Sequence, residues 1–371
     1  MGLLFRILAV LLLLVGLSAA AMSYWAWRWL QTESVVPEQN SVFVVPQGSN
    51  LHKVSRQLQQ RGLMNWPQVW IAYARITKTA QIRAGEYALN SSESPLSLLE
   101  KFRRGEVIQY SITFVEGITL REAFTQLHAH PKVNKSLVWP LTKEDLGIGK
   151  LDGTSLEGWF FPDTYRFVAG DSDRSILLRA HRRMQALLKA EWLERADDLP
   201  YNTAYEALIM ASIVEKETGA PHEREQIAGV FERRLQRGMR LQTDPTVIYG
   251  LGERYDGNIT RAHLRESTPF NTYVIRGLPP TPIALPGREA IRAALRPAPG
   301  DALYFVARGD GTHIFSATLD AHMDAVRRYQ HRRRAGYRSN YVDHEGADDS
   351  SNVDDSQSIP DAPAVEKEGA L

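Results

Sequence analysis

The longest hydrophobic pattern in the chain lies near its N-terminus. Residues 7–22 are all apolar or small, and no charged side chain appears between Arg6 and Arg28. About 21 uncharged residues are enough to cross the roughly 30 Å hydrocarbon core of a bilayer as a helix. A group of aromatic residues ends the run, as is typical at a headgroup boundary (Tyr24, Trp25, Trp27 and Trp29). We therefore expect a transmembrane helix over residues 7–29, after a short cytoplasmic segment, residues 1–6.

The alternative for this run is a cleaved signal peptide. Residues 19–21 are three alanines, which would suit a small-residue cleavage site. The hydrophobic run continues past them into the aromatic residues, and this favours a retained anchor. Because nearly the whole chain follows this first hydrophobic segment, we expect the N-terminus inside the cell and the body translocated across the membrane.

A small unit is predicted after the anchor. Residues 30–40 are polar with one proline and indicate a linker. Over residues 41–90 the pattern alternates between the two periods of secondary structure. It predicts a strand at 41–46, a helix capped by Ser49 and ending at Gly62, a helix at 66–77 and a strand at 85–89. This β-α-α-β order resembles a LysM-type module, a fold that grips glycan chains. A small α+β unit without that role has the same order.

A larger unit is predicted from residue 91 to residue 335. Its expected elements are a helix at 95–103, a strand at 107–115, a short helix opened by the capping box at 119–122, a long helix from Ser172 or Asp173 to 195, helices at 203–218 and 221–237, a hairpin around 309–311 and a helix at 319–334. Residues 130–155 lack periodicity, and residues 239–300 are rich in glycine and proline with little regular pattern. The fold class is therefore α+β, and the long irregular segment 239–300 suggests a functional region.

Charge is distributed unevenly along the 371 residues. The formal net charge is +1, but residues 339–371 contain nine acids and one lysine, a net charge of −8, which leaves +9 on the rest. This acidic, serine-rich tail is predicted to be disordered. A basic body suits an anionic partner such as nucleic acid, lipid headgroups or an acidic wall polymer, or it serves solubility alone. The absence of cysteine excludes disulfides, a thiolate nucleophile and cysteine-ligated metal.

Two glutamates end an unusually apolar helix. Residues 208–214 (LIMASIV) carry no charge, Glu215 and Glu217 follow, and Gly219 and Pro221 end the helix. A helix that is apolar on all sides is buried. Residues two apart on a helix point about 200° away from each other. The two carboxyl groups therefore cannot face the same cleft.

The end of this helix is a suitable place for an acid catalyst. The C-terminus of a helix carries partial negative charge, so a partly buried carboxyl group there should have a raised pKa. Cleavage of a glycosidic bond near neutral pH needs such a protonated carboxyl group. The alternative is a structural glutamate whose oxygens are satisfied by arginine or by backbone N–H groups of residues 221–224. The residues alone leave both interpretations open.

Other chemistries lack their motifs. The chain has no nucleophile elbow, phosphate-binding loop, zinc-protease helix or dinucleotide-binding glycine pattern. Its histidines lack carboxylates at metal-ligand spacing, and its basic residues lack an aromatic RNA-binding signature. We therefore predict no metal, no cofactor and no nucleic-acid partner.

Two long motifs carry a family resemblance. Residues 211–218 (ASIVEKET) and 237–250 (RGMRLQTDPTVIYG) closely resemble the endolytic murein transglycosylase family of bacterial inner membranes. Further matches lie at 115–117 (VEG), 157–164 (EGWFFPDT), 269–273 (PFNTY), 277–280 (GLPP) and 303–306 (LYFV). The similarity runs from the anchor to about Tyr329. The acidic tail departs from shorter members of the family.

The resemblance implies a function and a site. Members of the family have one transmembrane helix, a LysM-like subdomain and a catalytic domain in the periplasm. They cut nascent peptidoglycan between N-acetylmuramic acid and N-acetylglucosamine, leave a 1,6-anhydromuramic end that terminates strand elongation, and are thought to associate with peptidoglycan synthases. The catalytic acid is the second glutamate of the E-K-E motif, here Glu217.

Candidates for holding the sugars come from the irregular segment, because amides, tyrosines and carboxylates bind sugar hydroxyls. They are Gln242, Asp244, Asn271 and Tyr273. Ordinary turn chemistry is the alternative for each of these four residues. Glu116 and Glu157 are expected to be supporting or structural. The competing functions are a membrane-tethered wall-binding scaffold without catalysis and a muramidase that hydrolyses the same bond.

Overall fold

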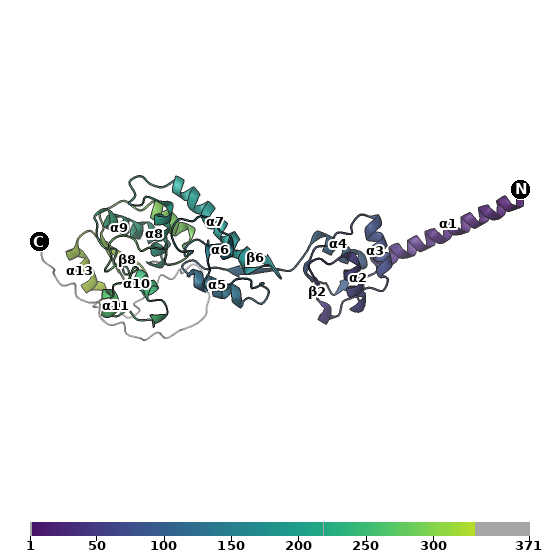
Figure 1. The fold of residues 1–371 in the computed structure, drawn as a ribbon, viewed down its shortest axis with the longest axis horizontal. Helices are drawn as coiled ribbons and strands as arrows, with labels where there is room; N and C mark the ends of the chain where they lie inside the picture. Colours follow the sequence, from purple (N-terminus) through teal and green to yellow (C-terminus); the bar gives the residue numbers. More distant parts are fainter. Residues whose placement is uncertain (1, 218, 331–371) are drawn as a thin grey trace. The chain divides into compact units, whose positions relative to one another are not determined.

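The computed structural model describes residues 2–217 and 219–330 (Figure 1). The chain forms two compact units. The smaller unit comprises Met1–Ser111, Pro131–Asn134 and Arg166–Ser172, and the larger unit comprises Ile112–His130, Lys135–Tyr165 and the chain from Asp173 onward. The mixed α+β class predicted from the sequence is confirmed.

The N-terminal helix α1 covers Gly2–Gln31, which is longer than the predicted span. Its most apolar window has a mean hydropathy of 2.5, and none of that window is buried. In length and composition α1 could cross a membrane, although a signal sequence has the same properties. Its last turn joins the smaller unit: Leu30 is buried in that core, and the Trp25 ring lies 5.5 Å from the Trp66 ring.

Residues 30–40 are folded, which differs from the linker predicted for them. Strand β1 (Ser34–Val35) pairs antiparallel with β4 (Ser92–Glu93), and a 3-10 turn covers Glu38–Asn40. Val36 joins Leu30 in the hydrophobic core. Two apolar residues among polar neighbours were too weak a pattern to reveal this packing.

The β-α-α-β order of the smaller unit is present as predicted. Strands β2 (Val42–Val45) and β3 (Gly85–Ala88) pair antiparallel, and helices α2 (Leu51–Gln60) and α3 (Pro67–Ile76) lie between them in sequence. Ser49 was the wrong cap, because the side chain of Asn50 accepts the bond from the backbone N–H of Lys53 (2.9 Å).

Large side chains fill the core of this unit, and helix α4 (Pro95–Arg104) closes it. The Trp70 indole is fully buried and donates to the Pro95 carbonyl (2.7 Å), so its polar edge is satisfied. The division between the units runs through the paired strands β5 (Gln109–Thr113) and β6 (Thr164–Val168), of which β6 was not predicted.

The larger unit is mainly helical. Its elements are α5 (Leu120–Ala129), α6 (Lys143–Leu146), α7 (Asp173–Leu193), α8 (Ala204–Glu217), a 3-10 turn at Pro221–Glu223, α9 (Arg224–Gln236), α10 (Asp244–Leu251), a 3-10 turn at Gly252–Arg254, α11 (Arg261–Arg265), α12 (Arg288–Leu295), β7 (Tyr304–Ala307), β8 (His313–Ser316) and α13 (Leu319–Tyr329). The capping box of α5 and the β7–β8 hairpin are confirmed. Residues 331–334 of the expected last helix and the tail 339–371 lie outside the described residues.

Helix α8 is the centre of the larger unit. Its eight consecutive residues Ala207–Val214 are all buried, and so is Tyr205, as its apolar sequence predicts. Its neighbours are α12, α9, α7 and α10. The prediction that residues 239–300 are irregular was wrong in part, because α10, α11 and α12 lie there. Proline and glycine on both sides concealed the short α12, whose alanines allow close packing on α8.

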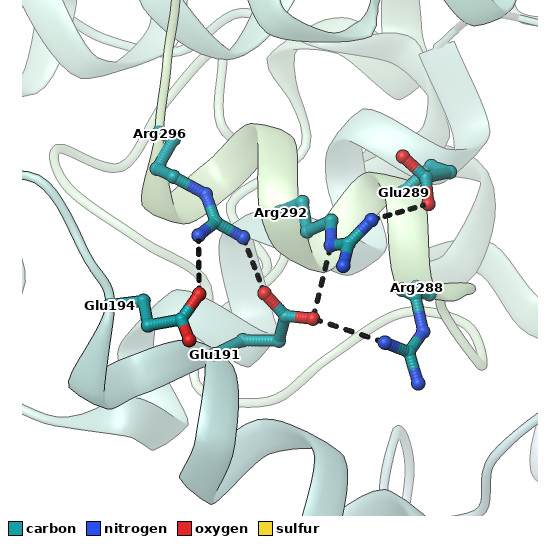
Figure 2. Close-up of polar contacts among 6 residues, drawn as sticks. All are labelled: Glu191, Glu194, Arg288, Glu289, Arg292 and Arg296. Carbon is teal, nitrogen blue, oxygen red and sulfur yellow. Dashed lines mark hydrogen bonds and ion pairs between the residues drawn. The ribbon is translucent and has the colours of Figure 1, made fainter.

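A cluster of charged residues joins α7 to α12 (Figure 2). Glu191 of α7 is 4% exposed. It contacts three arginines: Arg292 (3.0 Å) and Arg288 (3.5 Å) of α12, and Arg296, which follows α12. Because each arginine keeps part of its surface in water, this arrangement neutralises the buried carboxylate without burying three cations. The cluster therefore holds α12, and with it α8, in a defined position.

Candidate active site

Glu217 is the last residue of α8, and its side chain is partly buried. The Thr243 hydroxyl donates a hydrogen bond to Glu217 Oε1. Burial raises the pKa of Glu217 to about 7, and the negative charge of Asp244 adds to the rise, while the Thr243 hydrogen bond and the Arg234 charge oppose it. The carboxyl group is thus close to half protonated at neutral pH, as a general acid requires. The main cause of the raised pKa is burial of the carboxyl group, and not its position at the end of the helix.

Glu215 faces elsewhere, as the helical angle predicts. Its Oε2 accepts the backbone N–H of Gly287 (2.9 Å), and its Oε1 lies 3.6 Å from Arg224 Nη2. Burial, with the charge of Glu116, raises the pKa of Glu215, and the Gly287 N–H and Arg224 oppose that rise. The structural alternative, a glutamate satisfied by arginine and backbone N–H, therefore describes Glu215 and not Glu217.

Thr243 is a site residue that the sequence analysis missed. It precedes α10 as the N-cap residue, yet its hydroxyl makes no capping bond and is directed to Glu217. Its backbone N–H donates to Thr272 Oγ1 (3.0 Å), and its carbonyl accepts from Thr246 Oγ1 (2.7 Å). These three threonines are almost fully buried. They form a rigid hydroxyl cluster that holds the Thr243 donor against the carboxyl group.

Arg234 of α9 was also missed, because one arginine in an amphipathic helix gives no signal. Its side chain is 7% exposed. Its Nε donates to the Leu303 carbonyl (2.7 Å), its Nη1 donates to the Leu241 carbonyl (2.5 Å), and the guanidinium lies 5.3 Å from the Tyr304 ring centre. Arg234 thereby fixes the chain just before Thr243 and puts a buried positive charge near Glu217.

Asp244 and Tyr273 form a pair beside this carboxyl group. The Tyr273 hydroxyl donates to Asp244 Oδ1 (2.6 Å). Asp244 is exposed, and it is the first residue of α10 rather than part of a loop as predicted. Burial and the charge of Asp244 raise the pKa of Tyr273, so the phenol remains a donor at neutral pH. The structure thus places two of the four predicted sugar-binding residues next to each other.

Gln242 and Asn271 differ in their accessibility. Gln242 is exposed, and its φ of 50° is in the left-handed region that non-glycine residues seldom occupy. Asn271 is 1% exposed, and its Nδ2 donates to the carbonyls of His263 (3.0 Å), Leu264 (3.2 Å) and Glu266 (2.8 Å). Its Oδ1 accepts the backbone N–H of Tyr273 (3.0 Å). In the structure, Asn271 therefore fixes the backbone of Tyr273 and is not accessible itself.

The two other acids flagged in the sequence take supporting positions. Glu157 is buried, and it accepts the backbone N–H of Leu120 (2.9 Å) at the start of α5 and the hydroxyl of Tyr249 (3.2 Å). Burial raises the pKa of Glu157 to about 7. The exposed Glu116 packs its carboxylate so closely on Gly287 that a side chain at that glycine would collide with it.

Fold and site together define a class of protein: a long apolar N-terminal helix, a small α+β unit, and a larger α+β unit in which a protonatable glutamate ends a buried helix. The model of the YceG-like family matches residues 43–328, which is most of the chain. The chain therefore belongs to the YceG-like family, as the resemblance in its motifs predicted.

Curated relatives carry one name. An endolytic murein transglycosylase of Bacillus subtilis (strain 168) is 28% identical over 302 residues, which cover 77% of this chain and 83% of that protein. One of Streptococcus pneumoniae (strain D39) is 29% identical over 298 residues, which cover 71% of this chain but 53% of that protein. A crystal structure of a yceG-like protein, lmo1499 of Listeria monocytogenes, is 27% identical and covers 79% of this chain and 99% of that one, with a TM-score of 0.46.

Proposed function

We propose that this protein is a peptidoglycan lytic endotransglycosylase, a lyase that cleaves the glycan strands of peptidoglycan. The observation that carries the proposal is the carboxyl group of Glu217, which is partly buried, has a pKa of about 7 and accepts a hydrogen bond from the Thr243 hydroxyl. The relatives named endolytic murein transglycosylase support it.

One carboxyl group is enough for this reaction. Protonated Glu217 donates to the bridging oxygen between N-acetylmuramic acid and N-acetylglucosamine as the bond to C1 breaks. The C6 hydroxyl of the same muramic residue attacks C1, and the ionised Glu217 takes the proton of that hydroxyl. The products are a free strand end and a 1,6-anhydro end, with no water consumed. A hydrolase would use a second carboxyl group about 5 to 9.5 Å from the first. The carboxylate of Asp244 lies near Glu217, so the products decide between the two reactions.

The polar groups near Glu217 suit sugar binding: Gln242 and Asp244 are exposed, and Tyr273 is half-buried. Gln242, Asp244 and Tyr273 present an amide, a carboxylate and a phenol, which bind sugar hydroxyls. Buried Asn271 acts through Tyr273, whose backbone N–H it fixes. The ionised Asp244 would also favour the positive charge that develops at C1 in an oxocarbenium-like transition state.

Position in the cell follows from α1. We infer that α1 is retained in the inner membrane, with a cytoplasmic N-terminus and both units in the periplasm. Strand cleavage there would terminate elongation of nascent glycan, and peptidoglycan synthases would then be partners. These inferences rest on the apolar helix and on the motifs shared with the family.

The smaller unit is our candidate for a second contact with the glycan strand. A cavity of about 380 Å³ lies between α2 and α3, and its walls include His52, Gln59, Gln68 and Arg75. This cavity favours a glycan-binding role of the LysM type. A wall-binding scaffold without catalysis would bind glycan in the same way. Analysis of the reaction products therefore has to distinguish the scaffold from the transglycosylase.

The test is digestion of purified glycan strands with mass spectrometry of the products. The unsubstituted protein should produce anhydro ends, and Glu217→Gln should produce none. Glu225→Gln, an exposed acid on α9, is the control and should cleave normally. A scaffold would retain strands without making new ends. A muramidase would give products heavier by one water.

A further inference from the structure

A second cavity lies in the larger unit, beside the start of α7. It has a volume of about 510 Å³, within the usual range for ligand pockets. Its walls are formed by residues 136–140, by Asp145 of α6 and by Arg174 of α7. None of the residues assigned to the Glu217 site lines it. The cavity therefore needs an explanation of its own.

The irregular wall of this cavity is held by a buried carboxylate. Asp173 is fully buried and accepts from the backbone N–H groups of Ser136 (3.0 Å) and Leu137 (3.0 Å) and from the Ser136 hydroxyl (2.5 Å). His128 of α5 contacts the same carboxylate (2.8 Å). Three hydrogen bonds to Asp173 thus anchor a segment without regular structure, as is usual for a preformed binding loop.

The anchored segment exposes apolar side chains to solvent. Val138 is 79% exposed and Trp139 is 36% exposed. The Trp139 ring packs on Phe124 of α5, with the ring centres 5.6 Å apart, so it cannot turn inward freely. A fixed, exposed tryptophan beside a cavity is a surface on which a sugar ring or an apolar side chain can pack.

Opposite charges line the same cavity without pairing. Arg174 is exposed, and its guanidinium lies over Gly147 and forms no ion pair with any acid in the described part of the chain. Asp145 accepts from the backbone N–H (2.9 Å) and hydroxyl (2.7 Å) of Thr142, which keep its pKa low and its carboxylate ionised. The cavity thus offers donors for a carboxylate and an acceptor for N–H or ammonium groups.

We propose that this cavity binds the peptide stem of murein. The stem is linked to muramic acid and carries both carboxylates and N–H donors, which match Arg174 and Asp145, while Trp139 packs on the adjoining sugar or side chain. This deepens the function proposed above and rests on it, because it assigns to the enzyme a preference for strands that still carry their peptides.

Helix α5 links the end of α8 to the wall of this cavity. Gly117, just before α5, accepts from Lys216 Nζ (3.1 Å), so the start of α5 lies at the end of α8. Phe124 and His128, farther along α5, contact the cavity wall. At 1.5 Å per residue, Leu120 and His128 are about 12 Å apart along the helix. One helix of the larger unit therefore connects the cavity with the end of α8 that carries Glu217.

Binding in the absence of cleavage tests the proposal. The full chain carrying Glu217→Gln, in detergent, is mixed with soluble glycan strands that bear peptide stems, and with the same strands after an amidase has removed the stems. We expect the stems to tighten the Kd by about tenfold, as one charge-assisted hydrogen bond would. Adding Arg174→Ala should abolish the difference and leave binding of bare strands unchanged. Arg182→Ala, an exposed arginine of the same helix, should keep it.

Each other outcome overturns the proposal. Equal Kd values for the two substrates in the Glu217→Gln parent would show that stems are not recognised. If Arg174→Ala weakens binding of both substrates equally, the substitution acts on strand binding or on the fold in general, and the proposal fails. The conservative Trp139→Phe variant should keep part of the stem preference and provides an independent check. If the proposed function itself is wrong, the unsubstituted protein will form no anhydro products in the digestion experiment.

Discussion

The hydroxyl of Thr243 is the hydrogen-bond donor to the carboxyl group of Glu217, although the two residues are 26 positions apart in the chain. The bond favours the ionised form of the carboxyl group, whereas burial and the charge of Asp244 favour the protonated form. The balance of these effects sets the pKa near 7, so altering one neighbour should move it in a direction that can be stated in advance.

Removal of the Thr243 hydroxyl should raise the pKa of Glu217. In Thr243→Val the ionised carboxylate loses its donor while the side-chain volume is nearly unchanged. The alkaline limb of the rate against pH, where the acid loses its proton, should move to higher pH. The pH profile of kcat/KM for anhydro-product formation measures this shift. Thr125→Val, at an exposed threonine of α5, should leave the profile unchanged.

Removal of the Asp244 charge should shift the same limb in the opposite direction. Asp244→Asn takes away a negative charge that raises the pKa of Glu217, so the alkaline limb should move to lower pH. Tyr273→Phe, which removes the hydroxyl bonded to Asp244 but keeps the charge, should weaken substrate binding instead and raise KM. Shifts of the same sign in Thr243→Val and Asp244→Asn would contradict the electrostatic account.

Folding stability should depend on the protonation of Glu217. Its folded pKa of about 7 lies above the ordinary value of 4.5 for a glutamate, so the native state binds the proton more tightly than the unfolded state. Stability is therefore full below pH 4.5, falls as pH rises towards 7, and stays lower above it. Glu217→Gln should stabilise the protein at pH 8 by about 1–3 kcal/mol, at 1.36 kcal/mol per pKa unit and with a discount for partial exposure. Chemical denaturation at pH 5 and pH 8 measures it.

Arg234 should matter for both stability and the site. In Arg234→Met the carbonyls of Leu241 and Leu303 lose buried donors, which should cost about 2–4 kcal/mol of unfolding free energy. Loss of the positive charge should also raise the pKa of Glu217. Denaturation together with the pH profile detects the two effects. If Arg234→Met lowers the stability but leaves the pH profile of kcat/KM unchanged, the role of Arg234 is purely structural.

The Glu191 cluster provides a test away from the site. Glu191→Gln leaves the three arginines at α12 and its C-terminal end facing an uncharged side chain, and it should destabilise the larger unit by about 1–3 kcal/mol. Activity at a temperature where the protein stays folded should be close to normal. A selective loss of activity without loss of stability would show that the cluster affects the site directly.

Part of the site could be predicted from local rules. The 100° step of a helix separated Glu215 from Glu217, and the structure confirms that separation through the contacts of Glu215 with Gly287 and Arg224. The apolar sequence of α8 likewise predicted a buried helix, because burial on all sides leaves a pattern in consecutive residues.

The rest of the site depends on contacts between distant segments. Thr243 reads as an ordinary helix cap, and its use as a donor to Glu217 requires α10 to lie beside the end of α8. Arg234 reads as a surface arginine until β7 and the segment before α10 cover it. Asn271 reads as an accessible amide, and only the tertiary fold shows that three carbonyls surround it.

The central claim is that Glu217 performs strand cleavage without water. The most direct measurement is mass spectrometry of glycan strands digested by the full chain and by its Glu217→Gln variant, at equal concentrations of folded protein. We predict 1,6-anhydro ends from the unsubstituted protein and no new ends from the variant. Products heavier by one water, or near-normal cleavage by Glu217→Gln, would contradict the account.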